Sequence, residues 1–287
     1  MNVRRMILSL VVLLAVSVPL VAQGTYKQID YPGALQTLIY GINTGGDLVG
    51  AYEDTNFQWR GFLLSGGVFT AIEYPLESDT YAYGINDVGQ IVGQTGLRGF
   101  IYDIGTKAFT ILSFPNNENG ATTAVGINNG GTIVGYFFHQ SLVTGFQLSA
   151  GTYKVILPGP VHNSVTTGIN NLNDVVGYGF NNTGPIMNFI FNPGMTKRVK
   201  IRADEISGIN DAGTVVGTYR GPGGIAVGFV LPKGGTAEKI IFPGAGVSDT
   251  GPFAINNNGV VAGWFVDSGG AKDHGFIWTP DAKPEGE

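Results

Sequence analysis

The chain has 287 residues, of which 21 are acidic and 16 basic, giving a net charge of −5, and it contains no cysteine. The lack of cysteine excludes disulfides, lipid attachment at an N-terminal cysteine and thiol chemistry, and the lack of a Lys/Arg cluster argues against a nucleic-acid partner. Glycine, at 46 residues, is about twice as frequent as the usual ~7%, and charged residues, at 13%, are about half the usual ~25%. Together with an apolar fraction of 43%, this composition is typical of a β protein with many tight turns.

The first 22 residues have the pattern of a secretory signal peptide. Arg4 and Arg5 precede a predominantly apolar run, residues 6–18, and the small Ala22 follows at a position suited to cleavage. The run is shorter than the roughly 20 residues that a membrane-spanning helix needs, and no second such run follows. We therefore expect residues 1–22 to be removed and residues 23–287 to form one exported domain, periplasmic or extracellular, without membrane insertion.

A triplet, Gly-Ile-Asn, recurs along the chain at spacings of 40 to 46 residues, which is the length of a propeller blade. The six copies begin at Gly41, Gly84, Gly126, Gly168, Gly208 and, as Ala-Ile-Asn, Ala254. Three residues after each Asn stands a glycine, or Asn173 in the fourth copy. Because glycine and asparagine adopt positive φ most readily, the pattern predicts a tight β-hairpin turn in which the repeated Asn side chain accepts hydrogen bonds.

The rest of each period predicts two more strands. A Gly-Phe strand, varied to Asn188-Phe189 in copy four, is followed by a strand such as FTAIEYP, residues 69–75. Four strands in about 42 residues make one blade, so we predict an all-β, six-bladed β-propeller with four strands per blade. The sixth copy stops after its third strand, whereas residues 26–34 match the fourth-strand pattern. We therefore predict that the N-terminal strand completes the last blade and closes the ring.

These repeats resemble the HAF family of extracellular repeats, which occur in exported bacterial proteins and are named for a His-Ala-Phe tripeptide in the third strand. The resemblance covers essentially all of residues 23–287. Only the last copy keeps the histidine, as His274-Gly275-Phe276, whereas Arg60 and Arg98 stand there in the first two copies. The resemblance implies export and a repeat architecture, and it brings no catalytic residues to this sequence.

A binding site is expected on the face opposite the repeated turns, because variable loops gather there on a rigid ring. Trp264 can stack on a sugar ring, although it stands where other copies carry a tyrosine, which favours packing. The two loop histidines either converge on a channel mouth or lie apart on the surface. The candidate ligand-binding residues are Glu53, Asp54, Trp59, His139, His162, Asp249 and Trp264.

Asp267, Asp273 and His274 form a candidate metal site in a Gly-rich loop. Carboxylates in such a loop suit calcium, yet DSGGAKD does not match the calcium-loop spacing. No cofactor other than calcium is expected. The carboxylate pairs Glu53-Asp54, Glu77/Asp79 and Asp204-Glu205 are candidates for acid–base chemistry, and they are more simply interpreted as solvated charges in an acidic protein.

The sequence contains none of the common nucleophile or phosphate-binding motifs. We therefore expect a monomeric, non-catalytic recognition or scaffold module whose ligand is a polysaccharide, an envelope component or another extracellular protein. The alternative is a glycan-active hydrolase or lyase that uses acidic residues at the channel mouth. A third hypothesis is a purely structural repeat in a surface layer. Of these three, an enzyme would require a deep site whose titratable residues have perturbed pKa values.

Overall fold

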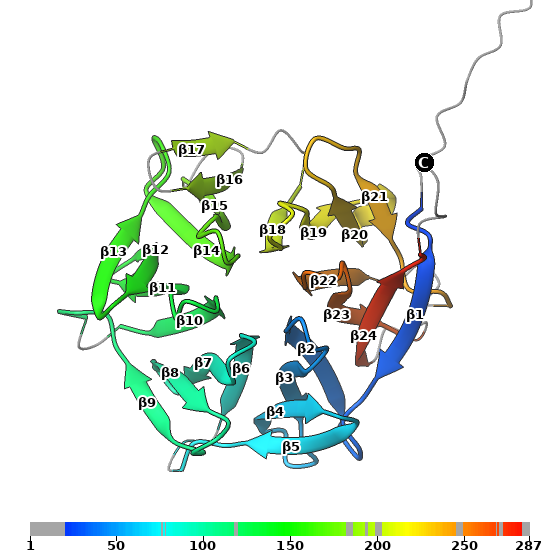
Figure 1. Cartoon of the computed structure of the whole chain (residues 1–287), viewed down its shortest axis with the longest axis horizontal. Helices are drawn as coiled ribbons and strands as arrows, with labels where there is room; N and C mark the ends of the chain where they lie inside the picture. Colours follow the sequence, from blue (N-terminus) through cyan, green and yellow to red (C-terminus); the bar gives the residue numbers. More distant parts are fainter. Residues whose placement is uncertain are drawn as a thin grey trace, which may run out of the picture.

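The computed structural model describes residues 21–75, 77, 79–117, 120–181, 186–192, 195–198, 203–244, 249–267, 269 and 272–282. Most of the predicted signal peptide, residues 1–20, lies outside these ranges. The described residues form six four-stranded antiparallel sheets arranged around a central channel (Figure 1). The predicted six-bladed β-propeller is confirmed.

Each blade runs from an inner strand at the channel to an outer strand at the rim. Blade 1 contains β2 (Gln36–Ile42), β3 (Leu48–Glu53), β4 (Trp59–Ser65) and β5 (Val68–Ile72), and blade 2 contains β6 (Thr80–Ile85), β7 (Gln90–Thr95), β8 (Arg98–Asp103) and β9 (Phe109–Leu112). Blade 3 contains β10 (Thr122–Ile127), β11 (Ile133–His139), β12 (Leu142–Ser149) and β13 (Thr152–Ile156), and blade 4 contains β14 (Asn163–Ile169), β15 (Val175–Phe180), β16 (Met187–Asn192) and β17 (Met195–Arg198). Blade 5 contains β18 (Glu205–Ile209), β19 (Val215–Arg220), a short 3-10 turn η1 (Pro222–Gly224), β20 (Ala226–Leu231) and β21 (Glu238–Ile240).

Blade 6 joins the two ends of the chain. Its strands are β22 (Thr250–Ile255), β23 (Val261–Val266), β24 (Asp273–Pro280) and, outermost, β1 (Gly24–Ile29). β1 pairs antiparallel with β24, from Gly24 opposite Pro280 to Ile29 opposite Gly275 (Figure 1). The predicted closure is therefore confirmed, and backbone hydrogen bonds hold the ring shut in a chain without cysteine.

The Gly-Phe strands supply the centre of each blade. Their phenylalanines are at most 1% exposed: Phe62, Phe100, Phe146, Phe189, Phe229 and Phe276. The ring of Phe62 lies against Gly50 of the neighbouring strand, where a Cβ atom would come within 2.8 Å of the ring. Burial of one such side chain stabilises the fold by roughly 1.5–3 kcal/mol. In blades 1 to 5, the glycine that follows the repeated Asn by seven residues thus makes space for the blade's central aromatic ring.

The repeated triplet and the turn that follows it have three separate roles. The glycine lies where the inner strands of neighbouring blades come closest, since a Cβ atom on Gly84 would be 2.6 Å from the Val125 carbonyl oxygen and 3.1 Å from the Gly126 Cα. The isoleucine packs below the channel, as Ile85 does at 7% exposure. The residue three positions after the repeated Asn has positive φ in all six copies, including 63° at Asn173, so the predicted left-handed position is confirmed.

Candidate functional site

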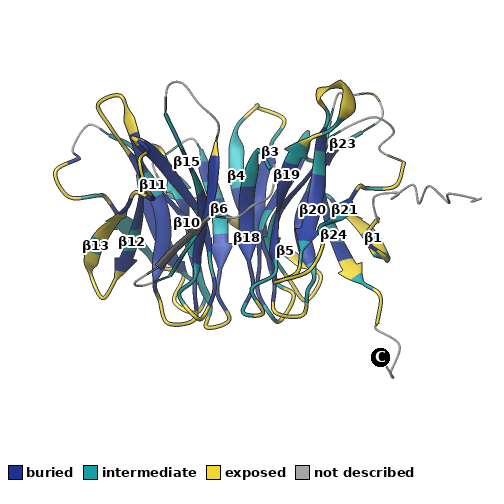
Figure 2. Cartoon of the chain, turned by 90° about the horizontal axis from the view of Figure 1, so that it is seen from above, coloured by how far each residue is buried: buried dark blue, intermediate teal, exposed yellow. Residues whose placement is uncertain are grey.

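The two faces of the ring differ in the loops that they carry. Figure 2 shows the buried strands edge-on between two faces of exposed connections. Because the strands alternate in direction, the repeated turns share one face, here called the turn face, and the variable loops share the other, the loop face. This is the predicted arrangement.

At the turn face, the six repeated asparagines connect neighbouring blades. Each Oδ1 accepts a hydrogen bond from the backbone N–H four residues later, at 2.8–3.0 Å. In five of them, Nδ2 donates to the backbone carbonyl of the equivalent Asn in the next blade, at 3.0–3.1 Å; these donors are Asn86, Asn128, Asn170, Asn210 and Asn256. Nδ2 of the sixth, Asn43, donates to the Asp47 carboxylate. The sequence predicted the turn bond and missed the link between blades.

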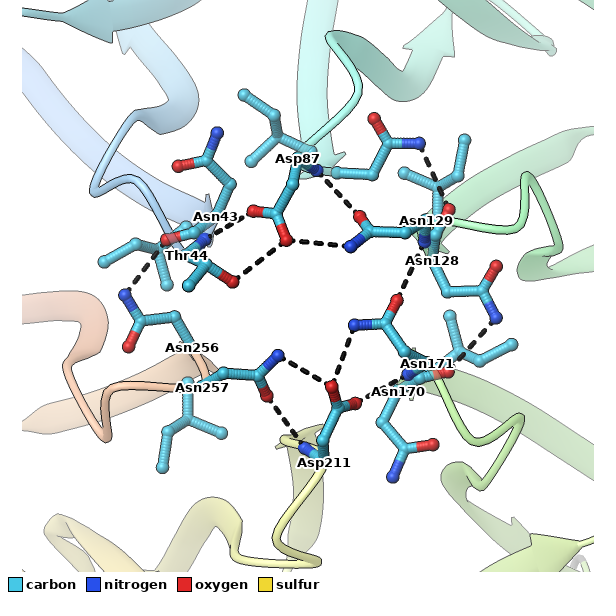
Figure 3. Close-up of a pocket in the computed structure, with 16 residues that line it drawn as sticks. Asn43, Thr44, Asp87, Asn128, Asn129, Asn170, Asn171, Asp211, Asn256 and Asn257 are labelled. Carbon is cyan, nitrogen blue, oxygen red and sulfur yellow. Dashed lines mark hydrogen bonds between the residues drawn. The ribbon is translucent and has the colours of Figure 1, made fainter.

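The residues after these asparagines form a second polar ring, called here the mouth ring: Thr44, Asp87, Asn129, Asn171, Asp211 and Asn257 (Figure 3). Asp87 accepts from the Thr44 backbone and hydroxyl and from the Asn129 amide, at 2.7–3.0 Å. Burial raises the pKa of Asp87, but these hydrogen bonds outweigh it and hold the pKa below the usual range. The cavity here is about 70 Å³, room for a few water molecules, so the turn face is closed to larger ligands.

Above the closed mouth lies a channel cavity of about 200 Å³. It is lined by the residue that precedes each triplet: Tyr40, Tyr83, Val125, Thr167, Ser207 and Phe253. These side chains are large and aromatic in blades 1, 2 and 6 and small in blades 3, 4 and 5. The free volume therefore lies off the axis, where Tyr136, Val165, Tyr178 and Glu205 also line it.

A second cavity, the rim cavity, adjoins the first and has a volume of about 420 Å³. Glu205 and Phe253 line both cavities. The rim cavity is lined by Leu38, Asp204, Glu205, Thr218, Arg220, Ala226, Asp249, Phe253, Trp264 and Asp273. These residues come from blades 1, 5 and 6, so one side of the ring combines an aromatic surface with four carboxylates.

The carboxylates of the rim cavity differ in how they are satisfied. Asp204 forms an ion pair with Arg220 at 3.2 Å, and Asp249 accepts a hydrogen bond from the Ala226 backbone at 2.6 Å. Burial raises the pKa of Asp273, His274 partly opposes this, and Asp249 and Asp267 raise it further.

Glu205 is half-buried on the first residue of β18. Burial raises its pKa, and the neighbouring Asp204 raises it further. Within the ranges that the structure describes, neither a hydrogen bond nor an ion pair satisfies the Glu205 carboxylate. Glu205 and Asp273 are therefore the two carboxylates of the rim cavity that no hydrogen bond or ion pair satisfies in the described part of the chain, and of the two only Glu205 also lines the channel cavity.

An arc of aromatic rings connects the two tryptophans of the candidate list. Centroid distances are 5.9 Å from Trp59 to Tyr81, 5.9 Å from Tyr81 to Tyr83, 4.8 Å from Tyr83 to Tyr40, 5.0 Å from Tyr40 to Phe253 and 6.4 Å from Phe253 to Trp264. The arc follows the channel wall through blades 1, 2 and 6. Trp264 faces the rim cavity, whereas Trp59 stacks on Tyr81 at the other end.

Of the predicted ligand-binding residues, the structure brings Asp249 and Trp264 together in the rim cavity. Glu53 instead accepts a hydrogen bond from Gln36 at 2.8 Å. Asp54 holds its own loop by accepting from the Asn56 and Gln58 backbones and pairing with Arg60. These two carboxylates have structural partners outside both cavities.

The two loop histidines lie apart. His139 is exposed beside Asn117 on blade 3, in a separate open cavity, and His162 is exposed before β14, where its backbone N–H donates to Asn181. The structure therefore does not support their convergence on a channel mouth.

Two of the candidate metal residues, Asp273 and His274, point in different directions. Asp273 lines the rim cavity, whereas His274, the next residue of β24, contacts Gln28 of β1 and Asp30 just after that strand at 2.8 and 2.9 Å and stacks on Phe265. Successive strand residues point to opposite faces. No group of three potential ligands positioned for a metal ion occurs in the described part of the chain, and residues 268, 270 and 271 of this loop lie outside it.

Glu205 was missed as a site residue, because the pair Asp204-Glu205 was interpreted as solvated charge. The signal was available in the repeat alignment. The residue three positions before the triplet glycine is Leu38, Tyr81, Thr123, Val165, Glu205 or Gly251. A single charge at a channel-facing position of the inner strands distinguishes blade 5 from the other five.

Solved structures with similar folds cover most of this chain. Oligogalacturonate lyase from Vibrio parahaemolyticus has 11% identity and a TM-score of 0.52, with 93% of this chain and 99% of that chain covered. The six-bladed fucose-recognising lectin of Aleuria aurantia has 12% identity and a TM-score of 0.50, with 91% and 100% covered. TolB from Acinetobacter baumannii has 10% identity and a TM-score of 0.50, with 88% and 66% covered.

At these identities the likeness shows a shared fold alone. Neither a protein-family model nor a curated protein sequence matches the chain. Among the described residues, no helix has the length and apolar character that crossing a membrane requires.

Proposed function

We propose that this protein is an exported, non-catalytic recognition module that binds a saccharide at the rim cavity. The observation that carries the proposal is the juxtaposition of Trp264 and Phe253 with four carboxylates in a cavity of about 420 Å³ on the loop face. Saccharides combine apolar ring faces with many hydroxyl groups. Such a ligand fits a cavity lined by aromatic rings and a few polar acceptors, of the size that small-molecule sites have.

The charge of the cavity restricts the saccharide class. Asp204, Glu205, Asp249 and Asp273 face one basic side chain, Arg220, which Asp204 already neutralises. An acidic sugar would place its carboxylate among like charges, which costs several kcal/mol in a confined site. We therefore propose a neutral or cationic sugar as the ligand.

Two further observations support the proposal. The Aleuria aurantia lectin, which recognises fucose, shares the six-bladed fold. The signal-like first 22 residues and the resemblance to HAF repeats favour export, which would place the protein where polysaccharides of the envelope and surroundings occur.

Binding is tested with purified residues 23–287 on a glycan array and then by calorimetry with the sugars that bind. Trp264→Ala should weaken binding by about tenfold or more, equivalent to ~1.4 kcal/mol. Phe57→Ala is the control, because Phe57 is 75% exposed on a loop of the same face and lines neither cavity. Equal affinity of both variants, each with an unchanged melting temperature, would contradict the proposal.

A glycan-active enzyme is the second candidate, and the raised pKa of Glu205 favours it, since a protonated carboxyl can act as a general acid. Any sugar that binds should be incubated with the protein and its products separated by chromatography. Release of shorter sugars that Glu205→Gln abolishes would establish the enzyme. An intact sugar after prolonged incubation supports the recognition module.

A further inference from the structure

The channel cavity has the composition of a cation-binding cage. Aromatic rings from five blades line it: Tyr40, Tyr83, Tyr136, Tyr178 and Phe253. Blade 5 contributes no ring and places Glu205 there instead. The faces of aromatic rings attract ammonium groups by about 0.5–2 kcal/mol each, more when water is excluded. A carboxylate beside them supplies the opposite charge.

Two hydroxyl groups of this cage are available to a ligand. Tyr40 and Tyr83 line the cavity, and their hydroxyls form no hydrogen bond with the residues that the structure describes. Burial raises the pKa of both well above the usual range and that of Tyr178 to about 12, so all three keep their protons at neutral pH. The Glu205 carboxylate is likewise unpaired, because Arg220 pairs with Asp204.

The cage is open on one side only. At the turn face, the mouth ring and the close approach of the triplet glycines leave a cavity of about 70 Å³, whereas the loop side continues into the rim cavity through Glu205 and Phe253. A cavity of about 200 Å³ is below the roughly 300–1,000 Å³ of sites that enclose a whole small molecule. It therefore suits the end of a ligand whose remainder lies in the rim cavity.

We propose that the saccharide bound here carries a free amine and enters the channel end-on, so that its ammonium group lies between Glu205 and the rings of Tyr40 and Tyr83. This inference rests on the proposed function. It identifies the ligand as a chain terminus of an amino sugar with an unsubstituted amine, and it assigns Glu205 as the residue that selects for the charge.

The test compares two matched ligands by calorimetry at pH 6 on residues 23–287: a glucosamine oligosaccharide and its fully N-acetylated counterpart of equal length. A third ligand, 1,5-diaminopentane, supplies amines without a sugar. The free-amine oligosaccharide should bind about tenfold or more tightly than the acetylated one. Glu205→Gln should remove this preference while the variant stays folded by thermal melting. Glu73→Gln is the matched control, since Glu73 is exposed and pairs with Arg60 outside both cavities.

The outcomes separate this inference from the proposed function. Equal or tighter binding of the acetylated sugar, or an amine preference that persists in Glu205→Gln, would overturn the inference and leave saccharide recognition standing. Binding of 1,5-diaminopentane as tight as that of the amino sugar, again dependent on Glu205, would support the amine site and overturn the role of the sugar. Binding of none of the three would overturn the amine site in every form, and the glycan array then decides the proposed function alone.

Discussion

Replacement of Asn86 by alanine tests the inter-blade links of the turn face. From the sequence alone, Asn86→Ala costs roughly 1 kcal/mol, the value of one lost turn hydrogen bond. In the structure, Asn86 is 3% exposed, accepts from the Gln90 backbone at 2.9 Å, and donates to the Asn128 carbonyl at 3.1 Å. Alanine leaves the Gln90 N–H without a partner and removes the inter-blade bond to the Asn128 carbonyl, which keeps its bond from the Gly131 N–H.

The two losses can be estimated separately. The unsatisfied Gln90 N–H costs about 1–3 kcal/mol and the lost bond to the Asn128 carbonyl about 0.5–1.5 kcal/mol, so the two together amount to about 1.5–4.5 kcal/mol. For a chain of this size, this corresponds to a fall in melting temperature of roughly 5–15 °C. Asn86→Asp keeps Oδ1 as an acceptor but sets a carboxylate oxygen against the Asn128 carbonyl and Gln90 Oε1, so at neutral pH it should cost at least as much as the loss of the inter-blade bond.

The assay is urea unfolding followed by tyrosine and tryptophan fluorescence, with thermal melts as a second measure. Val88→Ala serves as the control, because Val88 is in the same turn, is 62% exposed, and should change stability by less than ~0.5 kcal/mol. A loss below 1 kcal/mol for Asn86→Ala, or no loss for Asn86→Asp, would refute the argument that these bonds tie the blades. Ligand affinity should not change, since Asn86 lies on the closed face.

Three further predictions concern other parts of the ring. Glu205→Gln should raise the melting temperature at pH 7 and not at pH 4. Because the pKa of Glu205 is raised in the folded state, the carboxyl costs no stability below its unfolded pKa of about 4.3, and stability falls as pH rises through the folded pKa. An equal difference in melting temperature between the variant and the parent protein at both pH values would contradict this. Gly84→Ala should lower the free energy of unfolding by about 1–3 kcal/mol or more, because the new methyl group crowds the Val125 carbonyl and Gly126. Ala254→Gly, at the same position of copy six, should lower it by only about 0.5–1 kcal/mol. Chemical denaturation compares the two variants, and equal losses would argue against the close approach of the inner strands. Deletion of residues 23–34 removes β1 from blade 6 and exposes the edge of β24, so the protein should unfold or oligomerise. Size-exclusion chromatography and thermal melting measure this, and an unchanged monomer with an unchanged melting temperature would disprove closure by β1.

Much of the architecture could be predicted because the same local constraint recurs six times. One copy of the turn is a weak signal, but six copies in which only Gly or Asn173 occupies the position of positive φ leave few alternatives. Because the last copy lacks a fourth strand of its own, the N-terminal strand β1 could be assigned to that blade. The resemblance to HAF repeats and the calcium site in residues 267–274 remain predictions.

The site was less predictable because it depends on contacts between blades. Local sequence shows that Asn86 suits a turn but not that its Nδ2 reaches Asn128, 42 residues later. It shows that Glu205 is charged but not that β18 turns it into the channel. Trp264 was found by residue type, whereas the rim cavity beside it depends on residues that three blades bring together. The adjoining channel cavity exists because Ser207 and Thr167 are small where Tyr40 and Tyr83 are large.

The links of the turn face have a direction: in blades 2 to 6 the repeated Asn side chain donates to the blade that follows, and the last of these bonds joins Asn256 to Asn43 across the chain ends. Every such bond joins equivalent positions of successive copies. A chain with one blade duplicated in frame could therefore form the same bond at each junction, and its ring would only widen. The channel cavity offers no such equivalence, because its shape depends on which blade carries Tyr40, Tyr83 or Phe253. Gain or loss of a copy would thus preserve the scaffold and change the shape of the channel cavity.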